Sequence, residues 1–352
     1  MHQKNDYISK IVAMRTICLY IAAAAAAMTL TAGASAQENG SLRWEYWRHP
    51  VEYIHDQASV LLGYAGAVLD SEAPSEHPSE NRRLALTALD AILHDTTLDG
   101  SDEFHAFVDA RMEKLSRALG RKCGRGLEIY KVYNAGFVVR DKNLTVGFDL
   151  CARRGGMTIV ADDVMEKIVG CCDVLFISHR DPDHADASVI EIAGRLGIPV
   201  YGPEDFPNPG SKGVRKEDFS SIELATKRGS VKTQPLPGHQ DDLQNNIWVI
   251  TFPSGKTVAQ CGDQYNKDDL AWLGSAREKL ERRLDVLIID CWAMELQKVI
   301  EGFSPKAVIS AHENEMGHSI DHREAFWMSL YKYDTLPSDA VIMAWGEGFT
   351  YR

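Results

Sequence analysis

Hydrophobic residues recur at intervals of three and four along residues 41–119, and this spacing predicts amphipathic helices. The pattern is clearest in residues 59–70, 81–95 and 104–120. The segment SEAPSEHPSE (71–80) separates the first two, and its Pro and Ser content predicts a loop. We therefore expect a helical N-terminal region over residues 37–120.

The pattern changes near residue 125, where β-branched and aromatic runs begin to alternate with amphipathic segments. LEIYKVYNAGFVVRD and NLTVGFDL are predicted strands joined by a hairpin at Asp141-Lys142-Asn143. The further predicted strands are residues 173–178, 198–202, 246–253, 256–263, 285–292 and 306–312. The predicted helices are residues 161–170, 186–197, 268–284 and 322–334. This mixture predicts an α/β (α+β) domain over residues 121–352, with helices packed on sheets.

The first 36 residues predict a secretory signal peptide. Lys10 and Arg15 precede the apolar run ICLYIAAAAAAMTLTAG, and Ala34-Ser35-Ala36 follows as a small-residue cleavage site. We expect cleavage after Ala36 and a periplasmic or secreted protein. An uncleaved N-terminal anchor is the alternative interpretation.

Charge and cysteine content narrow the possible partners. The 352 residues carry a net charge of −12, and removal of residues 1–36 takes away three basic residues and one acidic residue, which leaves −14. This balance disfavours binding to nucleic acid and to an anionic membrane surface. We expect a small-molecule substrate, and a homo-oligomer is left open.

Cys18 lies in the predicted signal peptide, and the six remaining cysteines allow disulfides of undetermined connectivity. They form no CxxC pair of the kind found in zinc knuckles.

The segment DVLFISHRDPDHAD (173–186) crowds histidines and acids together directly after a predicted strand. Asp186 is expected to cap the following helix. His179, Asp181, Asp183 and His184 precede this cap, and their closely spaced carboxylates would repel one another without a cation to offset them. The segment therefore predicts metal ligands.

Three other predicted strand ends carry similar side chains. His239 lies in PLPGHQDD, Asp263 ends KTVAQCGD, and His312 ends KAVISAH with His318 six residues later. Loops at strand ends can aim side chains into one cleft, so these residues are expected to converge with those at 179–184.

Four more residues near strand ends are interpreted differently. Asp149 and Asp290 are expected to be hydrogen-bonding turn residues and not ligands. Cys261 and Cys291 have no evident basic partner that would lower a thiol pKa, so we expect them to be buried or disulfide-bonded.

The motifs H-R-D-P-D-H at 179–184, His239, Gly262-Asp263 and His312 resemble, in order and spacing, those of the metallo-β-lactamase fold superfamily. The resemblance covers roughly residues 125–350. It implies a four-layer αββα sandwich, here with the N-terminal helices as an appendage. It also implies one metal site at His179, Asp181 and His239, and a second at Asp183, His184 and His312, with Asp263 bridging them.

One position departs from the superfamily's H-x-H-x-D-H pattern, because Asp181 stands where the second histidine is expected. The resemblance implies two divalent ions, with zinc as the first expectation. A carboxylate hardens the site, so iron or manganese are alternatives. The flavodiiron proteins resemble this chain in having a carboxylate there, although no flavin-binding segment is apparent in this sequence.

The resemblance implies a binuclear metallo-hydrolase that cleaves an ester, lactone, amide or phosphodiester with a metal-activated hydroxide. Asp183 is expected to hold the hydroxide and relay its proton, and His318 to contact the substrate or protonate the leaving group. A β-lactamase is less expected because of Asp181. Two alternatives are a diiron redox protein and a non-catalytic binding protein on the same fold.

Overall fold

Two large β-sheets form the centre of the described chain. The computed structural model describes residues 49–206 and 208–352, so the predicted signal peptide lies outside the described residues. The first sheet has seven strands in the order β15-β1-β2-β3-β6-β7-β8. In chain order these are β1 (Leu127–Lys131), β2 (Phe137–Arg140), β3 (Thr145–Phe148), β6 (Val174–Phe176), β7 (Val200–Gly202), β8 (Lys212–Gly213) and β15 (Gly348–Tyr351).

The second sheet has six strands in the order β14-β13-β12-β11-β10-β9. In chain order these are β9 (Ile222–Thr226), β10 (Gly229–Gln240), β11 (Leu243–Thr251), β12 (Thr257–Gln260), β13 (Val286–Asp290) and β14 (Ala307–Ala311). A separate hairpin pairs β4 (Arg153–Arg154) with β5 (Met157–Thr158).

Parallel pairing fixes the place where a site can form. In the first sheet β3, β6 and β7 run parallel, and in the second sheet β12, β13 and β14 run parallel. The carboxyl ends of parallel neighbours meet at one edge of their sheet. The segments after β6, β12 and β14 carry most of the predicted ligands, so one such edge from each sheet brings them together.

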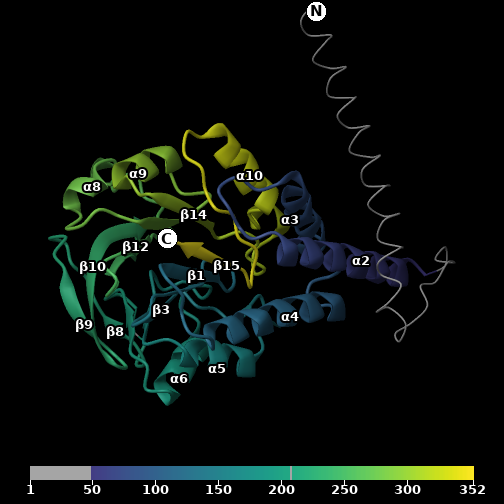
Figure 1. Cartoon of the computed structure of the whole chain (residues 1–352), viewed down its shortest axis with the longest axis horizontal. Helices are drawn as coiled ribbons and strands as arrows, with labels where there is room; N and C mark the ends of the chain where they lie inside the picture. The colour runs from purple at the N-terminus through teal and green to yellow at the C-terminus, as the bar shows by residue number, and fades with distance from the viewer. Residues whose placement is uncertain (1–48, 207) are drawn as a thin grey trace, which may run out of the picture. The chain divides into compact units, whose positions relative to one another are not determined.

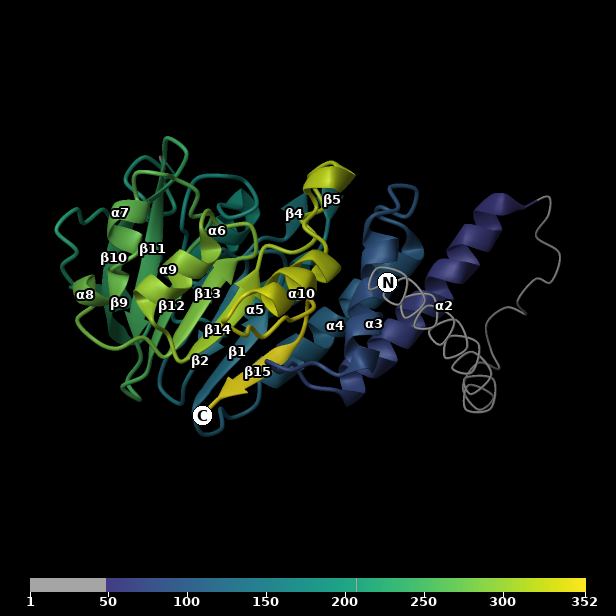
Figure 2. The ribbon, with the colours of Figure 1, turned by 90° about the horizontal axis from the view of Figure 1, so that it is seen from above.

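The core lies between the two sheets. Phe148, Phe176 and Trp248 come from both sheets and are buried, with Phe176 and Trp248 ring centroids 4.7 Å apart. Helices cover the two outer faces, with α9 and α10 on one side and α5 and α6 on the other (Figure 1). Figure 2 shows β12, β13 and β14 side by side within the second sheet. The predicted αββα order is therefore confirmed.

Helices begin and end close to the predicted segments. Ser79 and Ser101 cap α3 and α4 by accepting the N–H of Arg82 and Phe104, and Asp186 caps α6 through the N–H of Ser188. The helices are α2 (Pro50–Ser71), α3 (Glu80–Leu93), α4 (Asp102–Leu119), α5 (Asp162–Gly170), α6 (Ala187–Arg195), α7 (Leu270–Leu273), α8 (Ala276–Lys279), α9 (Leu296–Phe303) and α10 (Phe326–Thr335), with a short 3₁₀ turn η2 (Ile320–His322).

Two predicted segments are wrong in detail. The helix predicted over 268–284 is broken into α7 and α8 at Gly274, where Gly302 of α9 packs against the backbone of Leu273 and Gly274 too closely for any side chain. No strand was predicted between residues 203 and 245, but His239 lies near the end of the long strand β10. β9 pairs with β10 only as far as Thr233. Beyond that point one edge of β10 needs no backbone N–H donor, so prolines are tolerated there.

Residues 57–352 form one compact unit, in which α3 and α4 pack on the sheet domain. Arg82 of α3 forms a buried ion pair with Glu347, and Arg111 of α4 donates to the Trp345 carbonyl at 2.6 Å. The boundary expected at residue 120 remains a prediction. Among the helices of the described residues, none has the length and apolar character that a membrane crossing requires.

The cysteines of the described residues are unpaired thiols. Cys261 and Cys291 are buried, and burial raises the pKa of Cys291 to about 12 and that of Cys261 well above its ordinary value. Both are therefore weak nucleophiles, in agreement with the interpretation of these two residues as buried.

Candidate metal centre

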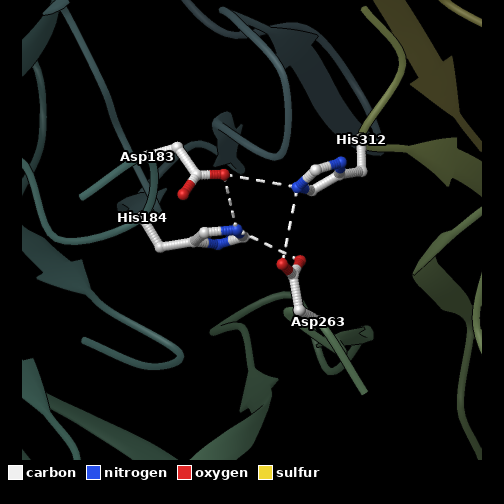
Figure 3. Close-up of side chains that lie close together, drawn as sticks. All are labelled: Asp183, His184, Asp263 and His312. Atoms are coloured by element: carbon white, nitrogen blue, oxygen red, sulfur yellow. Dashed lines mark ion pairs between the residues drawn. The ribbon is translucent and has the colours of Figure 1, made fainter. Parts of the chain in front are cut away.

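Four predicted ligands meet where the two sheets join. Asp183 and His184 lie in the segment between β6 and α6, Asp263 follows β12, and His312 follows β14. One ligand atom from each lies within 4.8 Å of every other, and all four residues are buried. Figure 3 shows the four side chains pointing toward a common centre.

The contacts alternate between carboxylate and imidazole around this centre. His184 Nε2 lies 3.2 Å from Asp183 Oδ2 and 3.1 Å from Asp263 Oδ1. His312 Nε2 lies 3.3 Å from Asp183 Oδ2 and 3.4 Å from Asp263 Oδ2 (Figure 3). Each imidazole nitrogen thus lies between two carboxylates, and these donors are the ones that zinc, iron and manganese accept in proteins.

Several buried ligand atoms have ion-pair contacts at 3.1–3.7 Å but no hydrogen bond within the described part of the chain. Nε2 of His179, His184 and His312 and Oδ1 of Asp263 make no hydrogen bond to any described residue, although all four atoms are buried. Burying a polar atom without a partner costs roughly 1–3 kcal/mol. A divalent cation would satisfy these atoms together, so the residues present fit a metal ion.

The electrostatics favour positive charge at this centre. Burial alone raises the pKa of Asp183 and of Asp263, but the imidazoles of His184 and His312 outweigh burial and hold both pKa values well below the ordinary value. Burial alone lowers the pKa of His184 and of His312, but the neighbouring carboxylates, Asp263 first, raise both well above the ordinary value.

Asp149 orients His184. Its Oδ2 lies 3.0 Å from His184 Nδ1 and accepts the Gln260 side chain at 2.8 Å, and the carboxylate accepts both the N–H and the hydroxyl of Ser178 at 2.7 Å. The Nδ1 proton is therefore directed at Asp149, and Nε2 faces the cluster. The prediction that Asp149 is a hydrogen-bonding turn residue is confirmed.

Gly262 allows the two sheets to approach each other at this point. Its φ is +55°, and a Cβ there would overlap Ser178 and Asn245. Only glycine combines this positive φ with the absence of a Cβ. Gly262 therefore allows the chain to pass close to Ser178, which brings Asp263 next to the segment after β6.

The backbone around His312 is strained and held in place. His312 and Asn314 have φ of +66° and +61°, a region that non-glycine residues seldom adopt. Between them Glu313 forms a fully buried ion pair with Lys131, and Asn314 Nδ2 donates to Asp90 Oδ1 of α3 at 3.0 Å. These buried contacts keep the His312 imidazole aimed at the cluster.

The predicted residues outside the four-residue cluster lie in different places. His179 is fully buried, and its Nε2 lies 3.6 Å from Asp181 Oδ2 and 3.7 Å from Asp263 Oδ2. The Asp181 side chain is 39% exposed. His239 lies away from the cluster, since its Nδ1 is 3.1 Å from Asp269 Oδ2 and its Nε2 is 3.0 Å from Arg215 Nη2. The structure therefore does not bring His239 to the metal position that the resemblance implies.

Asp290 corrects another expectation. It ends β13 and is fully buried, but neither oxygen of its side chain has a hydrogen-bond partner among the described residues. Burial, reinforced by the nearby Asp263 carboxylate, raises the pKa of Asp290 well above its ordinary value. Its side chain is therefore not the hydrogen-bonding turn group that the sequence predicted.

A cleft of about 370 Å³ opens onto the cluster. His318 lies on its wall with its side chain 41% exposed and its ring centroid 6.3 Å from that of His312. Trp292 packs edge-on against His312 at 5.4 Å. Arg154, from the β4–β5 hairpin, forms an ion pair with buried Glu315 and places Nη2 3.9 Å from Asp183 Oδ1.

Three residues of this site were missed by the sequence analysis. Asn134 donates from Nδ2 to Asp183 Oδ2 at 3.0 Å, Gln240 donates from Nε2 to Asp263 Oδ2 at 3.2 Å, and Arg154 lies on the wall of the cleft. None of them belongs to the expected motifs. The turn-forming Asn134-Ala135-Gly136, close to a predicted strand, was the one available signal.

Comparisons with known proteins identify the fold. No family model and no curated protein matches the sequence. The structure of Igni18, a metallo hydrolase from Ignicoccus hospitalis, matches with a TM-score of 0.50 at 15% identity, covering 64% of this chain and 98% of that chain. CmlA, a diiron β-hydroxylase from Streptomyces venezuelae, matches with a TM-score of 0.48 at 15% identity, covering 65% of this chain and 54% of that chain.

A Thermotoga maritima structure described under the metallo-β-lactamase superfamily matches with a TM-score of 0.37 at 14% identity, covering 61% of this chain and 97% of that chain. The chain shares its fold with the Igni18 metallo hydrolase, and its two sheets with helices on both outer faces have the four-layer order that the resemblance to the metallo-β-lactamase fold superfamily implied. Identities this low show the fold alone, so the chemistry must be argued from the site itself.

Proposed function

Starting from the metallo-β-lactamase fold, we propose that this protein is a metal-dependent hydrolase with a binuclear centre. The observation that carries the proposal is the ring of Asp183, His184, Asp263 and His312, whose buried ligand atoms face one another. A structural role alone does not explain why two imidazoles and two carboxylates are buried around one centre.

The residues divide into two groups around Asp263. Asp183, His184 and His312 would hold one cation, His179 and Asp181 would contribute to the other, and Asp263 would bridge them. When bound, two divalent cations supply a Lewis acid and a source of hydroxide at neutral pH.

Asp183 is suited to accept and pass on a proton. Asn134 fixes its Oδ2 at 3.0 Å, and its lowered pKa keeps the carboxylate ionised at neutral pH. His318, on the wall of the cleft, is placed to contact the substrate or to protonate the leaving group.

The cleft supports a small substrate that carries negative charge. Its volume of about 370 Å³ fits a small molecule. Arg154 binds Glu315 through Nε and keeps Nη2 3.9 Å from Asp183, so its guanidinium lines the cleft, where it can also contact a carboxylate or phosphate group. Trp292 offers an apolar surface beside it. An ester, lactone, amide or phosphodiester bond in such a molecule is the proposed target.

The proposal includes export and the absence of macromolecular ligands. The basic flank, apolar run and Ala34-Ser35-Ala36 site support cleavage after Ala36 and a periplasmic or secreted protein. The acidic balance supports a protein that binds neither nucleic acid nor membrane surface.

A diiron redox protein is the second candidate. The carboxylates of Asp181, Asp183 and Asp263 make the donor set harder than an all-histidine site, which favours iron over zinc. Metal content separates the two candidates, because a diiron protein would carry about two irons with a visible absorption band.

The test of hydrolysis is a panel of chromogenic esters, lactones, cephalosporins and phosphodiesters with protein purified without chelator. We expect turnover of at least one class and a loss of ~10²–10⁴-fold in Asp183→Asn at unchanged thermal stability. Asp162→Asn is the matched control, because Asp162 is exposed and pairs with Arg153. Equal rates for Asp183→Asn and the parent protein would contradict the role of Asp183.

A further inference from the structure

Strand geometry allows only one of two neighbouring residues to face the metal centre. His239 and Gln240 end β10, where they pair with Gln244 and Leu243 of β11. Successive side chains of a strand point to opposite faces of the sheet. If one of these two residues faces the cluster, the other faces away.

His239 faces away and uses both ring nitrogens there. Its Nδ1 contacts both oxygens of Asp269 at 3.1 and 3.2 Å, and its Nε2 lies 3.0 Å from the Arg215 guanidinium. Arginine only donates hydrogen bonds, so Nε2 must act as the acceptor and Nδ1–H as the donor. A guanidinium at Nε2 would also repel a metal cation.

The surroundings of His239 hold it in this position. Asp269 accepts hydrogen bonds from Gln264 at 2.9 Å and from the Trp272 indole at 3.2 Å. Arg215 also donates to the Gly238 carbonyl at 3.1 Å. Turning the imidazole toward the cluster would break both of its own hydrogen bonds and leave Arg215 and Asp269 each without one partner.

Gln240 faces the cleft. Its Nε2 lies 3.2 Å from Asp263 Oδ2, and its Oε1 is buried without a hydrogen-bond partner in the described part of the chain. A rotation of about 180° exchanges the amide oxygen and nitrogen without moving the rest of the side chain. After this exchange the amide oxygen takes the position next to Asp263 Oδ2, the same carboxylate oxygen that lies 3.7 Å from His179 Nε2.

The buried imidazole of His179 lies next to the same oxygen of Asp263; its Nδ1 contacts the Ser178 hydroxyl at 3.0 Å, which leaves Nε2 for another partner. His179 is 0% exposed, its Nε2 has no hydrogen bond to the residues that the structure describes, and it lies 3.7 Å from Asp263 Oδ2 and 3.6 Å from Asp181 Oδ2. Asp263 Oδ2 is thus a neighbour of both the Gln240 amide and His179 Nε2, and His179 Nε2 is also a neighbour of Asp181 Oδ2.

We propose that Gln240, and not His239, supplies the remaining protein ligand of the second metal ion, together with His179, Asp181 and Asp263. This inference rests on the binuclear centre of the proposed function. Three oxygen donors and one nitrogen donor form a hard set, which favours Fe(II) or Mn(II) over Zn(II) at this position. The first position, with two imidazoles and two carboxylates, keeps a more zinc-like set.

The test compares metal binding by the full-length protein and three variants. Metal-free wild type, Gln240→Ala, Gln240→Glu and His239→Ala are titrated with Mn(II), and bound metal is counted by mass spectrometry and calorimetry. We expect about two ions in the wild type, in Gln240→Glu and in His239→Ala, but about one in Gln240→Ala at the same concentration. The weaker affinity should fall by at least ~10-fold in Gln240→Ala.

Circular dichroism and thermal unfolding establish that each variant is folded. Loss of the second ion in His239→Ala, or its retention at wild-type affinity in Gln240→Ala, would overturn the assignment while leaving a binuclear hydrolase intact. A wild type that binds no divalent ion would overturn the assignment and the proposed function together. Because ions are counted without a substrate, failure to find the reaction does not affect this test.

Discussion

Asp149 Oδ2 lies 3.0 Å from His184 Nδ1 across the junction of β3 and β6, and this contact determines which imidazole nitrogen faces the metal centre. The Asp149 carboxylate acts only as an acceptor here, toward Ser178, Gln260 and His184. It thereby links the first sheet to the orientation of a ligand.

Asp149→Asn should weaken metal binding without removing a ligand. The substituted side chain would carry an NH₂ group where the carboxylate now accepts hydrogen bonds. This NH₂ group would face one of the present donors, so the contact that orients His184 would be weakened. We expect metal affinity to fall by about 10–100-fold, measured by competition with a chromogenic chelator. Asp141→Asn is the control, because Asp141 is a buried carboxylate that caps the β2–β3 turn away from the cluster. Similar affinities for both variants would contradict a positioning role for Asp149.

Arg154→Gln should weaken binding of anionic substrates selectively. A hydrogen bond to a charged group is worth roughly 1.5–3 kcal/mol, so KM for a substrate with a carboxylate or phosphate should rise by at least ~10-fold. A neutral substrate of the same class should show little change. Arg153→Gln is a neighbouring control, because Arg153 is 42% exposed and pairs with Asp162 at the surface. Equal effects on charged and neutral substrates would exclude recognition of an anion by Arg154.

The stability of the fold should depend on pH through Asp90. Burial is the largest influence and raises the pKa of Asp90 from 3.8 to about 6, although hydrogen bonds from Asn314, Trp327 and Phe326 act in the opposite direction. The folded state therefore binds this proton more tightly than the unfolded state does. The resulting stabilisation is fully present below pH 3.8 and is lost as the pH rises through about 6.

The expected size of this effect is about 3 kcal/mol, from a shift of about two pKa units. Urea unfolding between about pH 4 and pH 7 measures it by comparing the wild type with Asp90→Asn, which cannot titrate at this position. The wild type should lose more unfolding free energy than the variant across this range. Parallel curves for the two proteins would show that Asp90 is not the titrating group.

The metal motif could be predicted from local sequence, whereas the layer order was implied by the resemblance of that motif to a known superfamily. His179, Asp183 and His184 follow a short apolar strand directly, and Asp263 and His312 end strands of the same kind. Because parallel strands place such ends at one edge, local pattern and chain order were enough to predict four residues that the structure brings together.

The rest depended on contacts between distant residues. Pro235 and Pro237 lie within β10, and prolines argue against a strand. The strand was therefore not predicted, and neither was the alternation of side chains that places His239 and Gln240 on opposite faces. Lys131 and Glu313 are far apart in the sequence and meet only in the folded chain, and Arg154 reaches the cleft from a two-residue strand. Neither case leaves a local signal in hydrophobic spacing.

The central claim is that buried carboxylates and imidazoles hold divalent cations, and metal content tests it most directly. Wild type and Asp263→Ala are purified without chelator, incubated with Zn(II), Mn(II) or Fe(II), dialysed, and analysed by inductively coupled plasma mass spectrometry. Because Asp263 faces both groups of ligands, the wild type should retain about two ions per chain and Asp263→Ala fewer than one, with both proteins folded. A folded wild type that retains no divalent ion, or an Asp263→Ala variant that retains as many as the wild type, would contradict the account.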